Sequence, residues 1–143
     1  MSAQVTLIGN LTKDPELRFT TKGTPVANFT VACTSRIWSK EEQKFVDSNT
    51  VFMNVIAWHK LAENVADTFH KGNQCVVIGE LQQRSFEDKN GDTKTVYEVK
   101  AEHVAASMRF NSAMLNAKTT AHPSTGMTDD PWATKDPDNE IPF

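Results

Sequence analysis

The chain has 143 residues, a length that allows one compact domain and a tail. Its formal net charge of −3 argues against a uniformly basic nucleic-acid binder, yet residues 1–110 contain thirteen basic and thirteen acidic side chains. The excess acid lies in residues 111–143, so the neutral first part can still present a basic face.

Residues 1–110 are predicted to form β-strands and one helix. The strands are expected at 4–11, 25–36, 50–58, 74–82 and 94–102, with a short sixth at 104–110. Alternation is clearest in the second strand, where Ala27, Phe29, Val31 and Cys33 share one face. Asn90-Gly91 predicts a hairpin turn between the last two long strands.

Residues 59–70 have a helical period, because Leu61, Val65 and Phe69 recur every four residues. Gly72 is suited to the position just after the helix. Five strands with one helix between the third and fourth predict a β-dominated fold, the five-stranded Greek-key barrel called the OB-fold. This plan alone fits nucleic-acid, oligosaccharide and protein binders alike.

After Phe110 the composition changes to Thr, Ala, Asp and Pro, without periodic apolar residues. We expect a disordered acidic tail, consisting of a flexible linker at 111–135 and an acidic tip at 136–143. The tip, "DPDNEIPF", ends on large apolar residues held among acids. The expected boundaries are therefore 1–110 for the domain, 111–135 for the linker and 136–143 for the tip.

The strand at 50–58 indicates an aromatic outer face. Its odd-numbered residues are small and apolar enough for a barrel interior, so Phe52 and Trp58 are expected to point outward. Single-stranded nucleic acid binds to such aromatics when cations lie near them, because unpaired bases expose π-faces and phosphates need positive charge. An alternative is that Phe52 and Trp58 pack under a loop or a subunit interface.

Two further aromatics lie among polar residues and beside cations. Trp38 is expected in a polar loop next to Arg36, and Phe86 at the end of the fourth strand next to Arg84. A solvent-exposed aromatic side chain in a charged loop is energetically unfavourable unless another group stacks on it. Four such sites could supply most of the affinity of one subunit, since each base–aromatic stack contributes roughly 1–3 kcal/mol.

Three stretches resemble the bacterial single-stranded DNA-binding protein family, most closely its actinobacterial or actinophage members. They are "LIGNLTKDPELRFTTKGTPVANFTVA" (7–32), "WHKLAENVADTFHKGNQCVVIGELQQRSF" (58–86) and the tip. The resemblance covers residues 4–110 and the last few residues, but not the linker. Phe52, Trp58 and Phe86 exchange Phe and Trp relative to most members, and aromatic character is kept.

The resemblance implies a set of site residues. The bases would stack on Trp38, Phe52, Trp58 and Phe86. The cations on the DNA path would be Arg36, Lys60, Lys71 and Arg84, although each alone could equally be a solvated surface charge. The partner-binding tip would use Asp136, Asp138, Glu140, Ile141, Pro142 and Phe143, with the ring and the terminal carboxylate of Phe143 captured by a partner.

The function implied is sequence-independent binding and protection of single-stranded DNA during replication, recombination and repair, with partner proteins recruited by the tip. The family is typically a homotetramer, and residues 104–110 could clamp its subunits together. The expected location is the cytoplasm, in association with the nucleoid. The N-terminus has no basic, apolar leader, and the apolar runs are too short for a membrane helix.

Other functions fit the sequence less well. Catalytic motifs such as GxxxxGK[ST], GxSxG and HExxH are absent, so we predict no enzyme activity and no cofactor. The histidines lack metal-ligand spacing, and Cys33 and Cys75 are better explained as buried thiols than as a disulfide or a metal site. An OB-fold RNA chaperone and a purely protein-binding scaffold remain as alternatives.

Overall fold

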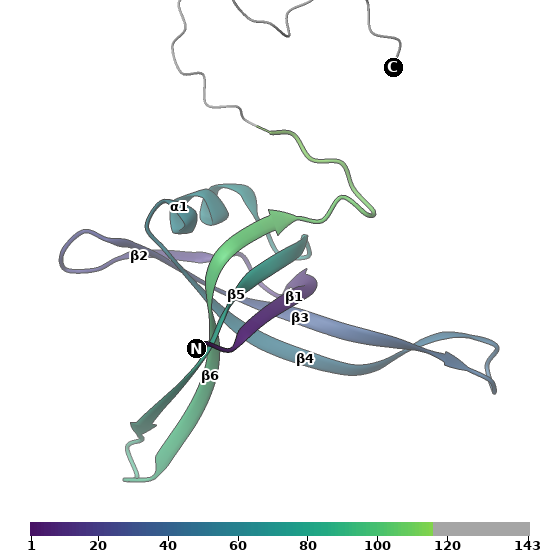
Figure 1. Cartoon of the computed structure of the whole chain (residues 1–143), viewed down its shortest axis with the longest axis horizontal. Coiled ribbons are helices and arrows are strands. Elements are labelled where there is room, and N and C mark those ends of the chain that lie inside the picture. The colour runs from purple at the N-terminus through teal and green to yellow at the C-terminus, as the bar shows by residue number, and fades with distance from the viewer. Residues whose placement is uncertain (116–143) are drawn as a thin grey trace, which may run out of the picture. The chain divides into compact units, whose positions relative to one another are not determined.

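The computed structural model describes residues 1–115 (Figure 1), within which a compact unit spans Met1–Ser112. Its elements, in chain order, are β1 (Gln4–Leu11), β2 (Glu16–Phe19), β3 (Pro25–Ser39), β4 (Lys44–Trp58), α1 (His59–Thr68), β5 (Gln74–Glu87) and β6 (Thr93–Ala106). Within residues 1–115, no helix is both long enough and apolar enough to cross a membrane.

The strands form one sheet that closes on itself. Their order is β1-β5-β6-β4-β3-β2, and β1 also pairs with β3, so five strands complete a barrel while β2 lies outside it on the edge of β3. The pairs are antiparallel except β4 with β6, which is parallel. The predicted OB-type barrel, with one helix between its third and fourth strands, is confirmed.

Several boundaries differ from the prediction. The strand β2 was not predicted, because its four residues are all exposed and carry no periodic apolar signal. The expected sixth strand at 104–110 was wrong as a separate element, because β6 continues without a break to Ala106. The helix was expected to reach residue 70 but ends at Thr68, after which Phe69 has extended backbone.

The central strands extend beyond the barrel as two-stranded arms, one formed by β3 and β4 and the other by β5 and β6 (Figure 1). In the first arm, Trp38 pairs with Phe45, so Trp38 lies in a strand and not in the loop that the sequence predicted. Both faces of this arm are largely exposed, which is why the buried–exposed alternation that identifies a strand stops at residue 34.

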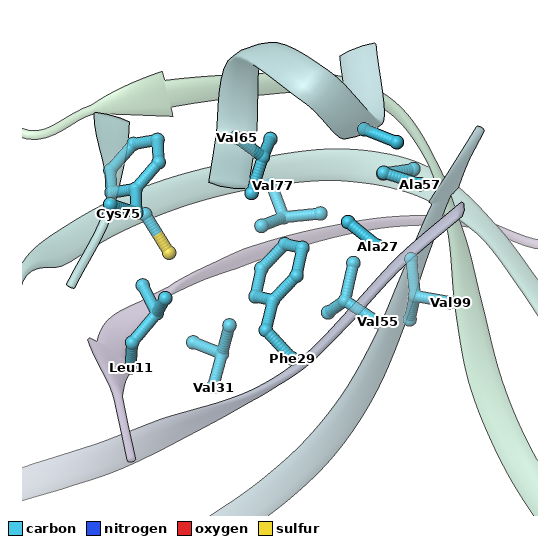
Figure 2. Packing of buried hydrophobic residues seen from close by; sticks show 13 residues of the cluster. Leu11, Ala27, Phe29, Val31, Val55, Ala57, Val65, Cys75, Val77 and Val99 are labelled. Atoms are coloured by element: carbon cyan, nitrogen blue, oxygen red, sulfur yellow. The ribbon is translucent and has the colours of Figure 1, made fainter. Parts of the chain in front are cut away.

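The core fills the barrel with small aliphatic side chains around Phe29 (Figure 2). Val31, Val55, Val77 and Val99 are buried almost completely, each from a different strand. Ala62 and Val65 of α1 are also buried, and the helix packs mainly against β3 and β4. Burial of each of these valine side chains contributes roughly 1.5–3 kcal/mol. The alternation that turns them inward therefore supplies much of the energy that stabilises the barrel.

Two glycines allow the strands to approach closely. A Cβ atom on Gly9 would overlap the carbonyl oxygen of Ala32, where β1 meets β3 and the barrel closes. A Cβ atom on Gly79 would overlap the carbonyl oxygen of Lys100, beside the register shift between β5 and β6. The closure of the barrel therefore depends on positions that cannot take a side chain without movement of the backbone.

Candidate nucleic-acid interface

The outer face of the β3–β4 ladder is set by the same alternation that builds the core. Phe29 and Val55 are paired and point inward, so the neighbouring pair Thr30 and Asn54 points outward. There the Thr30 hydroxyl donates to Asn54 Oδ1 over 2.9 Å. Phe52 is two residues before Asn54 on the same strand and therefore lies on this outer face.

The outer face continues along the arm to a pair of aromatic rings. After a bulge between Thr34 and Arg36, the ladder pairs Arg36 with Asp47 and Trp38 with Phe45. The rings of Trp38 and Phe45 lie 5.1 Å apart between centroids at an interplanar angle of 75°, an edge-to-face contact. Phe45 was missed by the sequence analysis, because it falls in a charged stretch without strand alternation.

The predicted stacking residues differ in exposure. The exposed fractions are 65% for Phe52, 53% for Trp38 and 44% for Phe86. Trp58 is half-buried, opposite Val26 at the last position of β4. The three exposed rings are therefore candidates for contact with a ligand, whereas Trp58 contributes partly to packing.

The β5–β6 arm supplies the second side of this surface. Arg84 and Phe86 are two residues apart on β5 and so share a face, opposite Val96 and Lys94 of β6. The parallel pairing of Asn54 with Glu98 connects this face to the outer face of β4. Phe86 and Phe52 therefore belong to one outer surface, although they come from different arms.

A groove of about 350 Å³ lies where the two arms leave the barrel. It is lined by Lys13, Asp14, Glu16, Asn28, Phe29, Thr30, Asn54, Val55, Arg84 and Glu98. Its rim is held partly by Asp14, whose Oδ1 accepts a hydrogen bond from the Lys71 backbone over 2.8 Å. The groove thus brings the predicted cation Arg84 next to Lys13, which the sequence analysis did not select.

Two other predicted cations, Arg36 and Lys60, do not line this groove. Arg36 Nε lies 3.2 Å from Asp47 Oδ1, and Lys60 Nζ lies 3.2 Å from Glu63 Oε2 on α1. Arg84 Nη2 lies 3.9 Å from Glu98 Oε2. Three of the four predicted cations therefore have a carboxylate partner in the protein itself.

Arg36 lines a second and larger hollow of about 760 Å³ at the base of the β3–β4 arm. Arg109 and Phe110 line it too, with the Arg109 guanidinium 5.3 Å from the Phe110 ring centroid. Gln74 Oε1 is buried without a hydrogen-bond partner beside them. Arg109 belongs to the stretch 104–110, which was considered for subunit contacts, and it was not predicted as a site residue.

The two cysteines are free thiols. Burial raises the pKa of Cys75 to about 11, with the nearby Cys33 adding to the shift, and burial also raises the pKa of Cys33. Both thiols are therefore protonated at neutral pH and weak as nucleophiles or metal ligands. Among residues 1–115, no group of three or more His, Cys, Asp or Glu side chains is placed to hold a metal ion.

The predicted tip residues 136–143 lie outside the described residues.

The closed barrel with α1 between β4 and β5 defines an OB-fold protein, and an outer face of exposed aromatics beside cations is typical of the OB-folds that bind single strands. The sequence matches the single-strand binding protein family over residues 2–107, and the chain belongs to that family.

Relatives with known names agree with this assignment. A single-stranded DNA-binding protein of Paenarthrobacter nicotinovorans is 39% identical over 150 residues, which cover 94% of this chain and 88% of the relative. One from Mycolicibacterium smegmatis is 43% identical over 112 residues, covering 78% of this chain and 68% of the relative. The predicted resemblance to actinobacterial members is confirmed.

A solved structure shows the same fold. The crystal structure of a small single-stranded DNA-binding protein from Streptomyces coelicolor superposes with a TM-score of 0.67 at 25% sequence identity. The superposition covers 76% of this chain and 96% of that chain.

Proposed function

We propose that this protein binds single-stranded DNA without reading its sequence, and so protects it during replication, recombination and repair. The observation that carries the proposal is the outer face on which Phe52, Trp38 and Phe86 stand exposed beside cations. Every base has a π-face, so stacking on these rings is indifferent to sequence. The phosphates would be neutralised by Arg36, Lys60, Lys71 and Arg84. The proposal includes no chemical step, and we propose that the protein is not an enzyme.

We propose that the functional form is a homotetramer in the cytoplasm, associated with the nucleoid. Ile8 and Ile78 are exposed on the outer face of β1 and β5, and Met108 and Phe110 are exposed after β6. Apolar residues gathered in this way favour burial between subunits. Several copies would also allow a small barrel to wrap a long strand.

We propose that the tip recruits proteins of replication, recombination and repair. Phe143 offers a ring for an apolar pocket and a terminal carboxylate for an Arg or Lys of the partner. Pro142 biases Ile141 toward extended backbone, which lowers the cost of ordering the tip on a partner. The acidic residues steer the tip toward basic surfaces.

Fluorescence anisotropy with labelled oligonucleotides tests the DNA-binding proposal. We expect oligo(dT) to bind more tightly than oligo(rU) of the same length, and both to bind more tightly than duplex DNA. The logarithm of the affinity for oligo(dT) should fall linearly with the logarithm of salt concentration, with a slope of about −0.7 per neutralised phosphate. Light scattering on the protein without DNA should give the mass of four chains.

Three results would contradict the proposal. Equal or tighter binding of oligo(rU) would favour the RNA chaperone instead. Absence of binding to every oligonucleotide would favour a protein-binding scaffold. A salt-independent affinity for oligo(dT) would remove the phosphate contacts from the account, because these contacts release counterions when they form.

A further inference from the structure

The two arginines that the proposed function assigns to phosphates both face a carboxylate. Arg36 and Asp47 are opposite each other in the β3–β4 ladder, with Nε and Oδ1 3.2 Å apart. Arg84 and Glu98 are diagonal neighbours in the β5–β6 ladder, which pairs Glu98 with Gln82, and Nη2 and Oε2 are 3.9 Å apart. Each arginine therefore already has an anionic partner in the absence of DNA.

The stability of the fold does not explain why a carboxylate lies beside each of these arginines. The side chains of Arg36 and Asp47 are 72% and 66% exposed, and ion pairs between groups that exposed contribute little to stability. The side chain of Glu98 is only 20% exposed, whereas its partner Arg84 is 66% exposed. Glu98 is thus held in place by its surroundings, while Arg84 reaches toward solvent and is free to exchange one anion for another.

The charge of the groove points the same way. Among its lining residues, Asp14, Glu16 and Glu98 outnumber Lys13 and Arg84. The groove therefore has a net negative charge, although it lies on the face proposed to bind the polyanion DNA. At the short range of these contacts, each carboxylate opposes the approach of a phosphate to the arginine beside it.

We infer that Asp47 and Glu98 are built-in competitors for the DNA phosphates at Arg36 and Arg84, an inference that rests on the proposed function. Binding then exchanges a carboxylate for a phosphate at each arginine, and no bond is formed or broken. The exchange lowers the affinity and the salt dependence below what the cations alone would give. It also assists stepwise release, because a carboxylate can take back its arginine as soon as a phosphate leaves.

Charge-neutral substitutions test the inference. Glu98→Gln and Asp47→Asn should each tighten binding of oligo(dT) by about threefold to tenfold at low salt, since each removes one charge close to a phosphate. The gain should shrink as salt rises, and the salt slope should steepen by up to about 0.7 for each substitution. Asp67→Asn is the matched control, because it removes the same charge from the exposed side of α1, where Asp67 has no ion pair among the described residues.

A double-mutant cycle separates local competition from a general change of charge. In an Arg84→Ala background, Glu98→Gln should give no more gain than Asp67→Asn, because the carboxylate then has no arginine to withhold. An equal gain in both backgrounds would overturn the inference. Weaker binding by Glu98→Gln would also overturn it, since Glu98 would then be holding Arg84 in its binding geometry.

The outcomes separate this inference from the function on which it rests. Failure of the unaltered protein to bind oligo(dT) would overturn the proposed function. Normal binding with no difference between Asp47→Asn and Asp67→Asn would overturn the competition alone. Asp47 is exposed on the arm, so the test remains decisive if Glu98→Gln does not fold.

Discussion

Phe52→Ala combined with Phe86→Ala is expected to weaken oligo(dT) binding by at least about thirtyfold. Each base–aromatic stack contributes roughly 1–3 kcal/mol, and about 2 kcal/mol is the smallest sum of two such stacks. The two residues lie on different strands, and both are exposed, so their losses should add and the barrel should stay folded. Anisotropy titrations at one fixed salt concentration measure the change.

Ile37→Ala is the matched control for this experiment. Ile37 is an exposed apolar residue next to Trp38, and the alternation of β3 places it on the opposite side of the arm. Its truncation should leave the affinity unchanged. A double variant that binds within threefold of the unaltered protein would contradict the assignment of Phe52 and Phe86 to the stacking face.

Deletion of residues 136–143 is expected to abolish recruitment of partner proteins while leaving DNA binding intact. The deleted segment holds three acidic residues, no cation and none of the aromatics of the stacking face. Its loss should leave oligo(dT) affinity unchanged or slightly tighter, most visibly at low salt, where screening is weak. Deletion of Phe143 alone should nearly match the full deletion, because it removes the ring and moves the terminal carboxylate onto Pro142.

Pull-downs from cell extract with full-length and truncated protein measure this effect. Deletion of residues 118–125, a segment of the same length in the predicted linker, is the matched control and should keep the partners. Retention of the same partners after loss of 136–143 would contradict the assignment of the tip. So would a tenfold loss of oligo(dT) affinity, which corresponds to about 1.4 kcal/mol of DNA contact.

The barrel could be predicted from sequence because its interior is periodic. Ala27, Phe29 and Val31 alternate with outward residues, and the pattern is the direct signature of a strand with one buried face. The arms could not be predicted in the same way. Beyond Thr34 both faces of β3 meet solvent, so burial leaves no mark on the residue pattern there.

The candidate site likewise has a part that could be predicted from residue alternation and a part that could not. Phe52 follows from the alternation of β4, and the structure places it outward. Phe45 depends on the register after the bulge between Thr34 and Arg36, which no local pattern reveals. The carboxylate partners depend on the register of strand pairing, since Glu98 reaches Arg84 only through the β5–β6 ladder.

Tryptophan emission during titration with unlabelled oligo(dT) tests the central claim most directly. A Trp132→Phe variant confines the signal to Trp38 and Trp58, because the chain contains three tryptophans. Stacking of bases on these rings should quench the emission in proportion to the DNA bound, as followed in parallel by anisotropy. Tight binding with unchanged emission would contradict the account, because the single-stranded DNA would then lie away from the outer face of β3 and β4.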